Sequence, residues 1–204
     1  NSVVETIAVT GNQVTGSGTS QITINPTNDL ESSTQYYVKI DATAFDDSVG
    51  NSYAGITDAT SLSFTTVDAV APTLSSSTPA DNATAVVEGS NIVLNFSEVV
   101  DVERGSIVIY KASNNSVVEA IDVTSNQVTG SGTSQITINP TDDLDSLTEY
   151  YLKIDATAFD DPSGNSYAGI HDTTSLSFTT GDAVDPTLTS SNPADDATAI
   201  AEDS

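Results

Sequence analysis

Carboxylates in two acidic segments and a linker of this sequence have the types and spacing of ligands for a hard cation. Glu98 and Asp101 follow an apolar run closely, and Asp160, Asp161 and Asn165 form a second group before the last apolar run. Calcium in proteins takes oxygen ligands, about six to eight of them, from carboxylates, amide carbonyls and water. The residues that we predict as calcium ligands are Asp68, Glu98, Asp101, Asp160, Asp161 and Asn165.

The same residues have a simpler interpretation that the sequence leaves open. Asp, Asn, Gly and Pro are favoured in turns for conformational reasons, and their carboxylates are then only solvated. Arg104 is the one base close in sequence to the first group, and Gly164 would provide a tight turn in the second. The sequence therefore leaves open whether these carboxylates bind a cation or are only solvated.

Catalytic chemistry has little support in the sequence. Cysteine is absent, and His171 is the only histidine, so neither thiolate chemistry nor a zinc site is expected. Paired carboxylates could serve a glycosidase, but acids in short turns do not indicate a cleft. We expect no enzymatic activity.

The charge balance excludes several partners. The chain of 204 residues has 29 acidic residues and four basic ones, which gives a net charge of −25. Such a chain is not expected to bind nucleic acid or an anionic membrane surface. Bound cations or high salt would relieve its self-repulsion. No run of about 18 apolar residues indicates membrane insertion, and the acidic, lysine-poor, cysteine-free composition fits a bacterial secreted or surface protein.

A repeat determines how the acidic segments are placed. Residues 1–90 align without a gap on residues 115–204, and the two stretches differ at 20 of the 90 aligned positions. A period of 114 residues predicts a tandem array of similar units. The predicted divisions are residues 1–66, the latter part of one unit; residues 67–180, a complete unit; and residues 181–204, the start of a third.

The two partial units cannot complete each other. Joined head to tail, residues 181–204 and 1–66 would still lack the equivalent of residues 91–114, which contains two apolar strands. We therefore expect the sequence to be a window from a longer chain. Exchange of strands between subunits is the alternative.

The complete unit reads as a series of short strands. Ile92, Leu94 and Phe96 alternate with more polar residues, as does the run around Leu152, and turn signals recur every 8 to 12 residues. Seven to eight strands in such a length indicate an all-β sandwich. The pattern also predicts an acidic loop over residues 97–105, a single helical turn over 141–146, and one tyrosine facing inward and one outward in the pair at 150–151.

Several segments resemble the bacterial Ig-like domain family. Residues 72–84, with Pro72, Pro79 and Asp81, are similar to the opening of its members, and residues 92–101 are similar to a second characteristic segment. Residues 136–151, 161–165 and 177–180 continue the likeness. The resemblance implies tandem Ig-like β-sandwiches, in which the two acidic groups lie at one pole together with the incoming linker.

Such domains are common as tandem spacers in large bacterial adhesins and S-layer proteins. The resemblance therefore predicts a non-catalytic spacer of an extracellular adhesin or surface fibre, stiffened by Ca2+ at domain junctions. Its expected partners are neighbouring repeats and other copies in a fibre. Two alternatives remain: a self-assembling filament or sheath subunit, and a carbohydrate-binding accessory module of a secreted protein.

Overall fold

The structure, a computed structural model, describes residues 2–198 and contains strands but no helices among them. This confirms the all-β class predicted from the sequence. The chain divides into two compact units, Asn1–Val70 and Ala71–Ser204, called unit 1 and unit 2 below. The predicted boundaries at 66/67 and 180/181 stay predictions, and residues 199–204 of the third predicted part lie outside the described residues. No described helix could cross a membrane.

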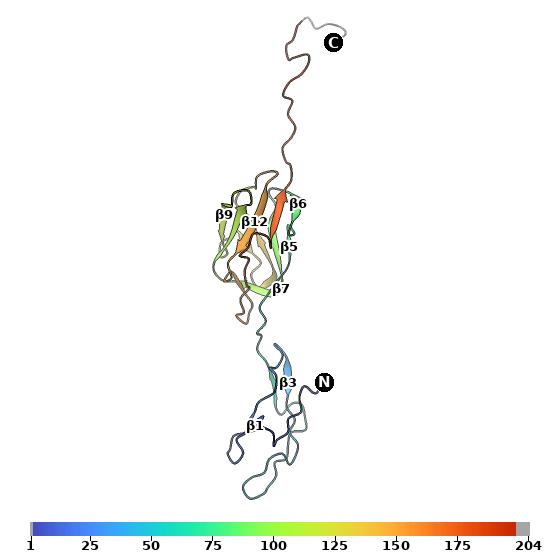
Figure 1. Ribbon diagram of the computed structural model, residues 1–204, viewed down its shortest axis with the longest axis vertical. Coiled ribbons are helices and arrows are strands. Elements are labelled where there is room, and N and C mark those ends of the chain that lie inside the picture. Colours follow the sequence, from blue (N-terminus) through green and yellow to red (C-terminus); the bar gives the residue numbers. More distant parts are fainter. Residues whose placement is uncertain (1, 199–204) are drawn as a thin grey trace. The chain divides into compact units, whose positions relative to one another are not determined.

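Unit 2 is a sandwich of two five-stranded sheets (Figure 1). One sheet has the order β10-β11-β7-β13, with β5 also paired to β7, and the other has the order β6-β14-β12-β8-β9. All pairs are antiparallel except β6 with β14. The strands are β5 (Leu74–Thr78), β6 (Ala83–Val86), β7 (Ile92–Val102), β8 (Ser106–Lys111), β9 (Ser116–Asp122), β10 (Val128–Thr129), β11 (Thr133–Ile138), β12 (Glu149–Ile154), β13 (Phe159–Asp160) and β14 (Ser177–Thr180).

Alternating apolar residues of both sheets form the core of unit 2. Ile92, Leu94 and Phe96 of β7 are at most 5% exposed, as the alternation predicted. From the other sheet, Ile109 and Leu152 are fully buried. Because each such side chain contributes roughly 1.5–3 kcal/mol when it leaves water, this double layer is the main source of the unit's stability.

The predicted acidic loop over residues 97–105 is wrong for most of its length, because β7 continues to Val102. Partners distant in sequence extend the strand: Val100 pairs with Thr133 of β11, and Val102 pairs with Phe159 of β13. The register is irregular between Asn95 and Val100, where the polar stretch is accommodated. The short strands β6 and β13 were also not predicted.

The single helical turn predicted over residues 141–146 is also wrong. The backbone N–H of Leu144 donates to the carbonyl oxygen of Glu88 at 3.1 Å, and that of Asp145 donates to the phenol oxygen of Tyr150 at 2.8 Å. Because tertiary partners take these donors, the local i to i−4 bonding of a helix does not form.

The chain enters and leaves unit 2 at opposite ends of the sandwich (Figure 1). At the start, Thr73 exchanges two hydrogen bonds with Ser97, one through the serine hydroxyl and one between backbones. At the end, Gly181 donates to the carbonyl of Val86 and accepts from the N–H of Leu147, both at 2.8 Å. Both ends of the unit are therefore fixed by backbone hydrogen bonds.

Unit 1 contains two separate two-stranded sheets, β1 with β2 and β3 with β4. They correspond, at an offset of 114 residues, to β10, β11, β12 and β14 of unit 2. Tyr36 pairs with Phe64 as Tyr150 pairs with Phe178, with ring centroids 6.0 Å apart in both cases. The strands are β1 (Val14–Thr15), β2 (Thr23–Ile24), β3 (Gln35–Tyr37) and β4 (Ser63–Thr65).

Candidate metal centre

The end of β7 and the short strand β13 bring two predicted ligands into register. Asp160 pairs directly with Asp101, so two carboxylates project from opposed positions of adjacent strands. The Ser131 hydroxyl donates to Asp101 Oδ1 at 3.4 Å. Asp160 Oδ1 is buried and has no hydrogen-bond partner among the described residues. Directly opposed like charges destabilise a strand pair unless something else compensates.

Asp161 organises the turn that follows β13. It is 4% exposed, and its Oδ1 accepts hydrogen bonds from the backbone N–H groups of Ser163 and Asn165, each at 2.8 Å. Its Oδ2 accepts from Asn165 Nδ2, also at 2.8 Å. Gly164 takes a φ of +86°, which glycine adopts without strain. The predicted tight turn at this glycine is therefore present.

These bonds set the protonation of Asp161. Burial raises the pKa of the carboxyl, but the hydrogen bonds from Asn165, Ser163 and Gly164 outweigh burial and hold the pKa below its usual value. The group is therefore a carboxylate near neutral pH. Its Oδ2 accepts a hydrogen bond from Asn165 Nδ2 and retains capacity for a further donor or a cation.

Glu98 lies beside this turn. One carboxylate oxygen of Glu98 and one of Asp161 lie within 4.8 Å of each other, and the Glu98 side chain is half-buried. A cation with ligand distances of about 2.3–2.6 Å bridges two oxygens at that separation. The structure thus brings Glu98 to Asp161 and Asp101 to Asp160, both within unit 2.

Asp68 belongs to unit 1. Its Oδ1 accepts hydrogen bonds from the Ser32 hydroxyl at 2.9 Å and from the backbone N–H of Val70 at 3.0 Å. The bond from Val70 closes a short turn at the end of unit 1.

The same turn recurs in unit 1 without a buried environment. Asp47 Oδ1 accepts from the N–H groups of Val49 and Asn51, and Oδ2 accepts from Asn51 Nδ2, at 2.8–2.9 Å. Asp47 is exposed there. The turn therefore forms from local bonds alone, which explains the Asp and Asn types independently of any cation.

A further aspartate cap was not identified from the sequence. Asp172 accepts hydrogen bonds from the N–H and hydroxyl groups of both Thr174 and Ser175, at 2.7–3.1 Å. These bonds, that of the Ser175 hydroxyl first, hold the pKa of Asp172 far below its usual value. Asp58 accepts the same bonds in unit 1. An aspartate two residues before Thr-Ser is the sequence signal for this cap.

The tyrosine pair differs from its prediction in one respect. Tyr150 faces the core as expected, but Tyr151 is only 4% exposed. Its ring stacks on Tyr110 at a centroid distance of 4.9 Å and an interplanar angle of 5°, and its hydroxyl donates to Asn115 Oδ1. Lys153 Nζ lies 5.7 Å from the centroid of Tyr110. The outward position is covered by neighbouring side chains.

Comparison with known proteins identifies a family for most of the chain. The family model described as Bacterial Ig-like domain matches residues 1–66 and 68–180. No curated protein matches the chain.

Two solved structures are similar to part of this chain, at low sequence identity. CopC from Methylosinus trichosporium OB3b has a TM-score of 0.41 and 15% identity, over 57% of this chain and 99% of that chain. The S-layer protein rSbsC(31-844) has a TM-score of 0.36 and 17% identity, over 56% of this chain and 14% of that chain. Likeness at this level does not indicate a shared ligand or activity.

Proposed function

The chain belongs to the bacterial Ig-like domain family, and we propose that it is a non-catalytic spacer in a long extracellular adhesin or surface fibre. A spacer must transmit force from one end of each unit to the other without unfolding. The acidic, lysine-poor composition fits a bacterial secreted or surface protein. Fold alone does not assign this function, so the proposal depends on how unit 2 is joined to the rest of the chain.

The observation that carries the proposal is the placement of the first and last strands of unit 2. The chain enters at β5 and leaves after β14, at opposite ends of the sandwich. Tension along the chain therefore acts along the strands of the β5–β7 and β12–β14 pairs. The hydrogen bonds between these strands lie at right angles to that direction. All bonds of a ladder then share the load, which suits a mechanical linker.

Single-molecule force spectroscopy on the full chain tests this role. Residues 71–180 number 110, and at about 3.3–3.6 Å per residue their unfolding releases roughly 35 nm of chain. We expect a discrete unfolding event with that extension. Smooth extension without such an event contradicts the spacer function, and reproducible binding on a glycan array favours the carbohydrate-binding alternative instead.

We further propose that calcium binds unit 2 where Glu98 meets the turn at Asp161. Three facts support it: the two carboxylate oxygens are within bridging distance, Asp160 Oδ1 is buried without a described hydrogen-bond partner, and Asp101 opposes Asp160. With four basic residues in the whole chain, protein cations are scarce.

Asp68 is proposed as a further ligand from its place in the sequence alone, in the segment that precedes Thr73.

Calorimetric titration of the chelator-treated full chain with CaCl2 tests the calcium proposal. Extracellular calcium modules bind with dissociation constants of about 0.1–1 mM, and tenfold saturation stabilises a protein by about 1.4 kcal/mol. Glu98→Gln should abolish the binding heat, whereas Glu103→Gln, an exposed acid just beyond β7, should retain it. Equal heats for both variants, or none for the unmodified chain, contradict the proposal.

A further inference from the structure

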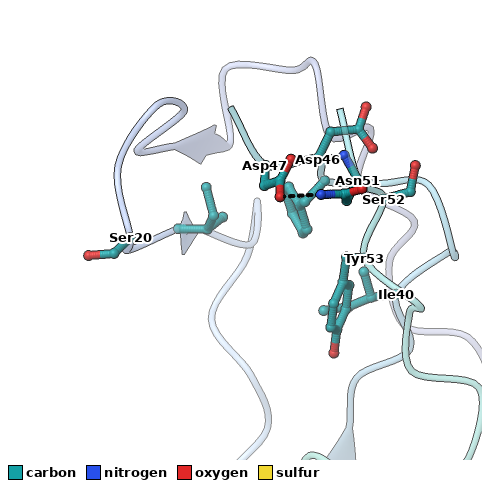
Figure 2. A pocket seen from close by; sticks show the side chains of 9 residues that line it. Ser20, Ile40, Asp46, Asp47, Asn51, Ser52 and Tyr53 are labelled. Atoms are coloured by element: carbon teal, nitrogen blue, oxygen red, sulfur yellow. Dashed lines mark hydrogen bonds between the residues drawn. The ribbon is translucent and has the colours of Figure 1, made fainter. Parts of the chain in front are cut away.

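Asp81 is a carboxylate that bonds to a strand distant in the sequence. Its Oδ1 accepts hydrogen bonds from the backbone N–H of Ser177 at 2.9 Å and from the Ser177 hydroxyl at 3.2 Å. Other aspartates bond within their own turns: Asp47 with Asn51 (Figure 2), and Asp172 with the residues two and three positions after it. Asp81 instead joins two segments that lie 96 residues apart.

The segment before β6 binds both backbone polar groups of Ser177. The N–H donates to Asp81, and the carbonyl oxygen accepts from the N–H of Asn82 at 2.7 Å. Ser177 is only 7% exposed, and a buried N–H group needs an acceptor. Because β6 begins only at Ala83, the Asp81 carboxylate replaces a strand carbonyl and extends the pairing along β14 beyond the start of β6.

Bonds between the same two segments continue to the point where the chain leaves unit 2. The parallel pair of β6 with β14 extends from Ala83 to Val86. Just after β14, the N–H of Gly181 donates to the carbonyl oxygen of Val86 at 2.8 Å. The link between residues 81–86 and residues 177–181 therefore extends along the whole of β14.

The parallel order of this link determines how tension acts on its bonds. The chain enters unit 2 on the N-terminal side of residues 81–86 and leaves it directly after β14, at the opposite end of the sandwich (Figure 1). Tension therefore pulls one segment from its N-terminal side and the other from its C-terminal side. Since the two segments are parallel, they are drawn past each other, and their hydrogen bonds are loaded together.

The first strand, β5, cannot replace this link. When β5 separates from β7, tension passes directly from residues 81–86 to residues 177–181, because these segments are bonded to each other. Residues 87–176, which contain most of the core, then lie outside the path of the force. They cannot extend until the link breaks.

We propose that Asp81 is a force-bearing residue, and that separation of residues 81–86 from residues 177–181 is the step that limits mechanical unfolding of unit 2. This inference rests on the spacer role proposed above. Interactions that are lost in the transition state set the unfolding rate, whereas interactions that persist there leave it unchanged. The bonds from Ser177 to Asp81 belong to the first class.

Constant-force spectroscopy of the full chain, held at its two ends, tests the proposal. Asp81→Ala should unfold unit 2 roughly tenfold faster at the same force, because bonds to a charged acceptor are lost. Asp81→Asn keeps a side-chain oxygen for the N–H of Ser177, so its rate should return most of the way to that of the unmodified chain. No acceleration by Asp81→Ala overturns the proposal.

Asp172→Ala is the matched control, because it removes aspartate hydrogen bonds that stay within one turn. It should lower the stability of unit 2 to urea but leave the unfolding rate under force unchanged. Equal acceleration by Asp172→Ala and Asp81→Ala overturns the proposal. If Asp81→Ala does not fold, Ser177→Ala serves the same comparison: it removes only the hydroxyl and should accelerate unfolding roughly threefold.

A second pulling direction distinguishes the force path from a general loss of stability. The chain has no cysteine, so Asn114→Cys and Ser163→Cys define two attachment points outside both bonded segments. Pulled there, Asp81→Ala should leave the unfolding rate unchanged, and equal acceleration in both directions overturns the proposal. A discrete unfolding event that is insensitive to Asp81→Ala refutes the role of Asp81 but leaves the spacer role intact, whereas absence of any event contradicts both.

Discussion

The ring of Phe96 meets that of Tyr167 edge to face, with centroids 5.2 Å apart and an interplanar angle of 82°. Phe96 comes from the long strand β7, and Tyr167 from the segment after the Asp161 turn. The contact therefore fixes the turn against β7, and both sides of the candidate metal centre depend on it. Pairs of this geometry add about 0.5–1.5 kcal/mol beyond area burial.

Replacing Phe96 with alanine should destabilise unit 2 by about 3–5 kcal/mol, because a buried ring is lost and a cavity remains. The change in unfolding free energy is measured by urea-induced unfolding of the full chain, with hydrogen exchange of the buried β12 amides as the probe. Val99→Ala on the same strand is the matched control: its side chain is 41% exposed, and we expect a loss below about 1 kcal/mol. Similar losses for both variants would contradict this packing.

Replacing Tyr150 with phenylalanine should cost unit 2 about 1 kcal/mol, because the phenol oxygen accepts the hydrogen bond from the N–H of Asp145. Tyr36→Phe removes the equivalent bond to the N–H of Glu31 in unit 1, at 2.9 Å. Tyr36 is only half-buried, so water can replace that partner and the loss should be smaller. Residue-resolved hydrogen exchange compares the two, and a larger loss for Tyr36→Phe would refute the explanation from burial.

The sequence predicted the core of unit 2 well, because alternation on β7 and β12 reports directly on which residues face inward. It did not predict that β7 passes Ser97, because polar residues there resemble a loop and the partners that extend the strand, Thr133 and Phe159, are distant in sequence. The helical turn failed for the same reason: the phenol of Tyr150 takes the N–H of Asp145.

The candidate site was predictable in part. The Asp161 turn follows from local residue types and is present in both units. The resemblance to Ig-like domains placed the two acidic groups at one pole, and Glu98 does lie beside Asp161. The direct pairing of Asp101 with Asp160 was not predicted, because it depends on the extension of β7 to β13.

Asp161 should make the stability of unit 2 depend on acid pH. Its folded-state pKa lies below the unfolded value of about 3.9. The stabilisation is therefore fully present above about pH 4 and is lost as the pH falls through the folded-state pKa. Asp161→Asn removes the ionisable group, so the difference in unfolding free energy between the two proteins should be largest at neutral pH and shrink towards about pH 2.

Urea titrations across that pH range measure the difference from the exchange of β12 amides. Asp47→Asn makes the same substitution in the same turn of unit 1, and it should leave the unfolding of unit 2 unchanged. A difference between Asp161→Asn and the unmodified chain that stays constant down to about pH 2 would show that the carboxylate is not stabilised by these bonds.

Alanine substitutions at Gly130 and Gly164 distinguish the free-energy cost of backbone strain from the cost of steric overlap. Both have positive φ, +101° and +86°. A Cβ at Gly130 would overlap the carbonyl oxygen of Gln135 across the β10–β11 turn, whereas a Cβ at Gly164 meets no atom within 4 Å. Gly164→Ala should therefore cost only the left-handed strain, about 1–2 kcal/mol. Gly130→Ala should cost about 3 kcal/mol or more, because the β10–β11 pair must also separate. Urea unfolding measures both, and comparable losses would mean that the turn can move away from Gln135 without breaking the pair.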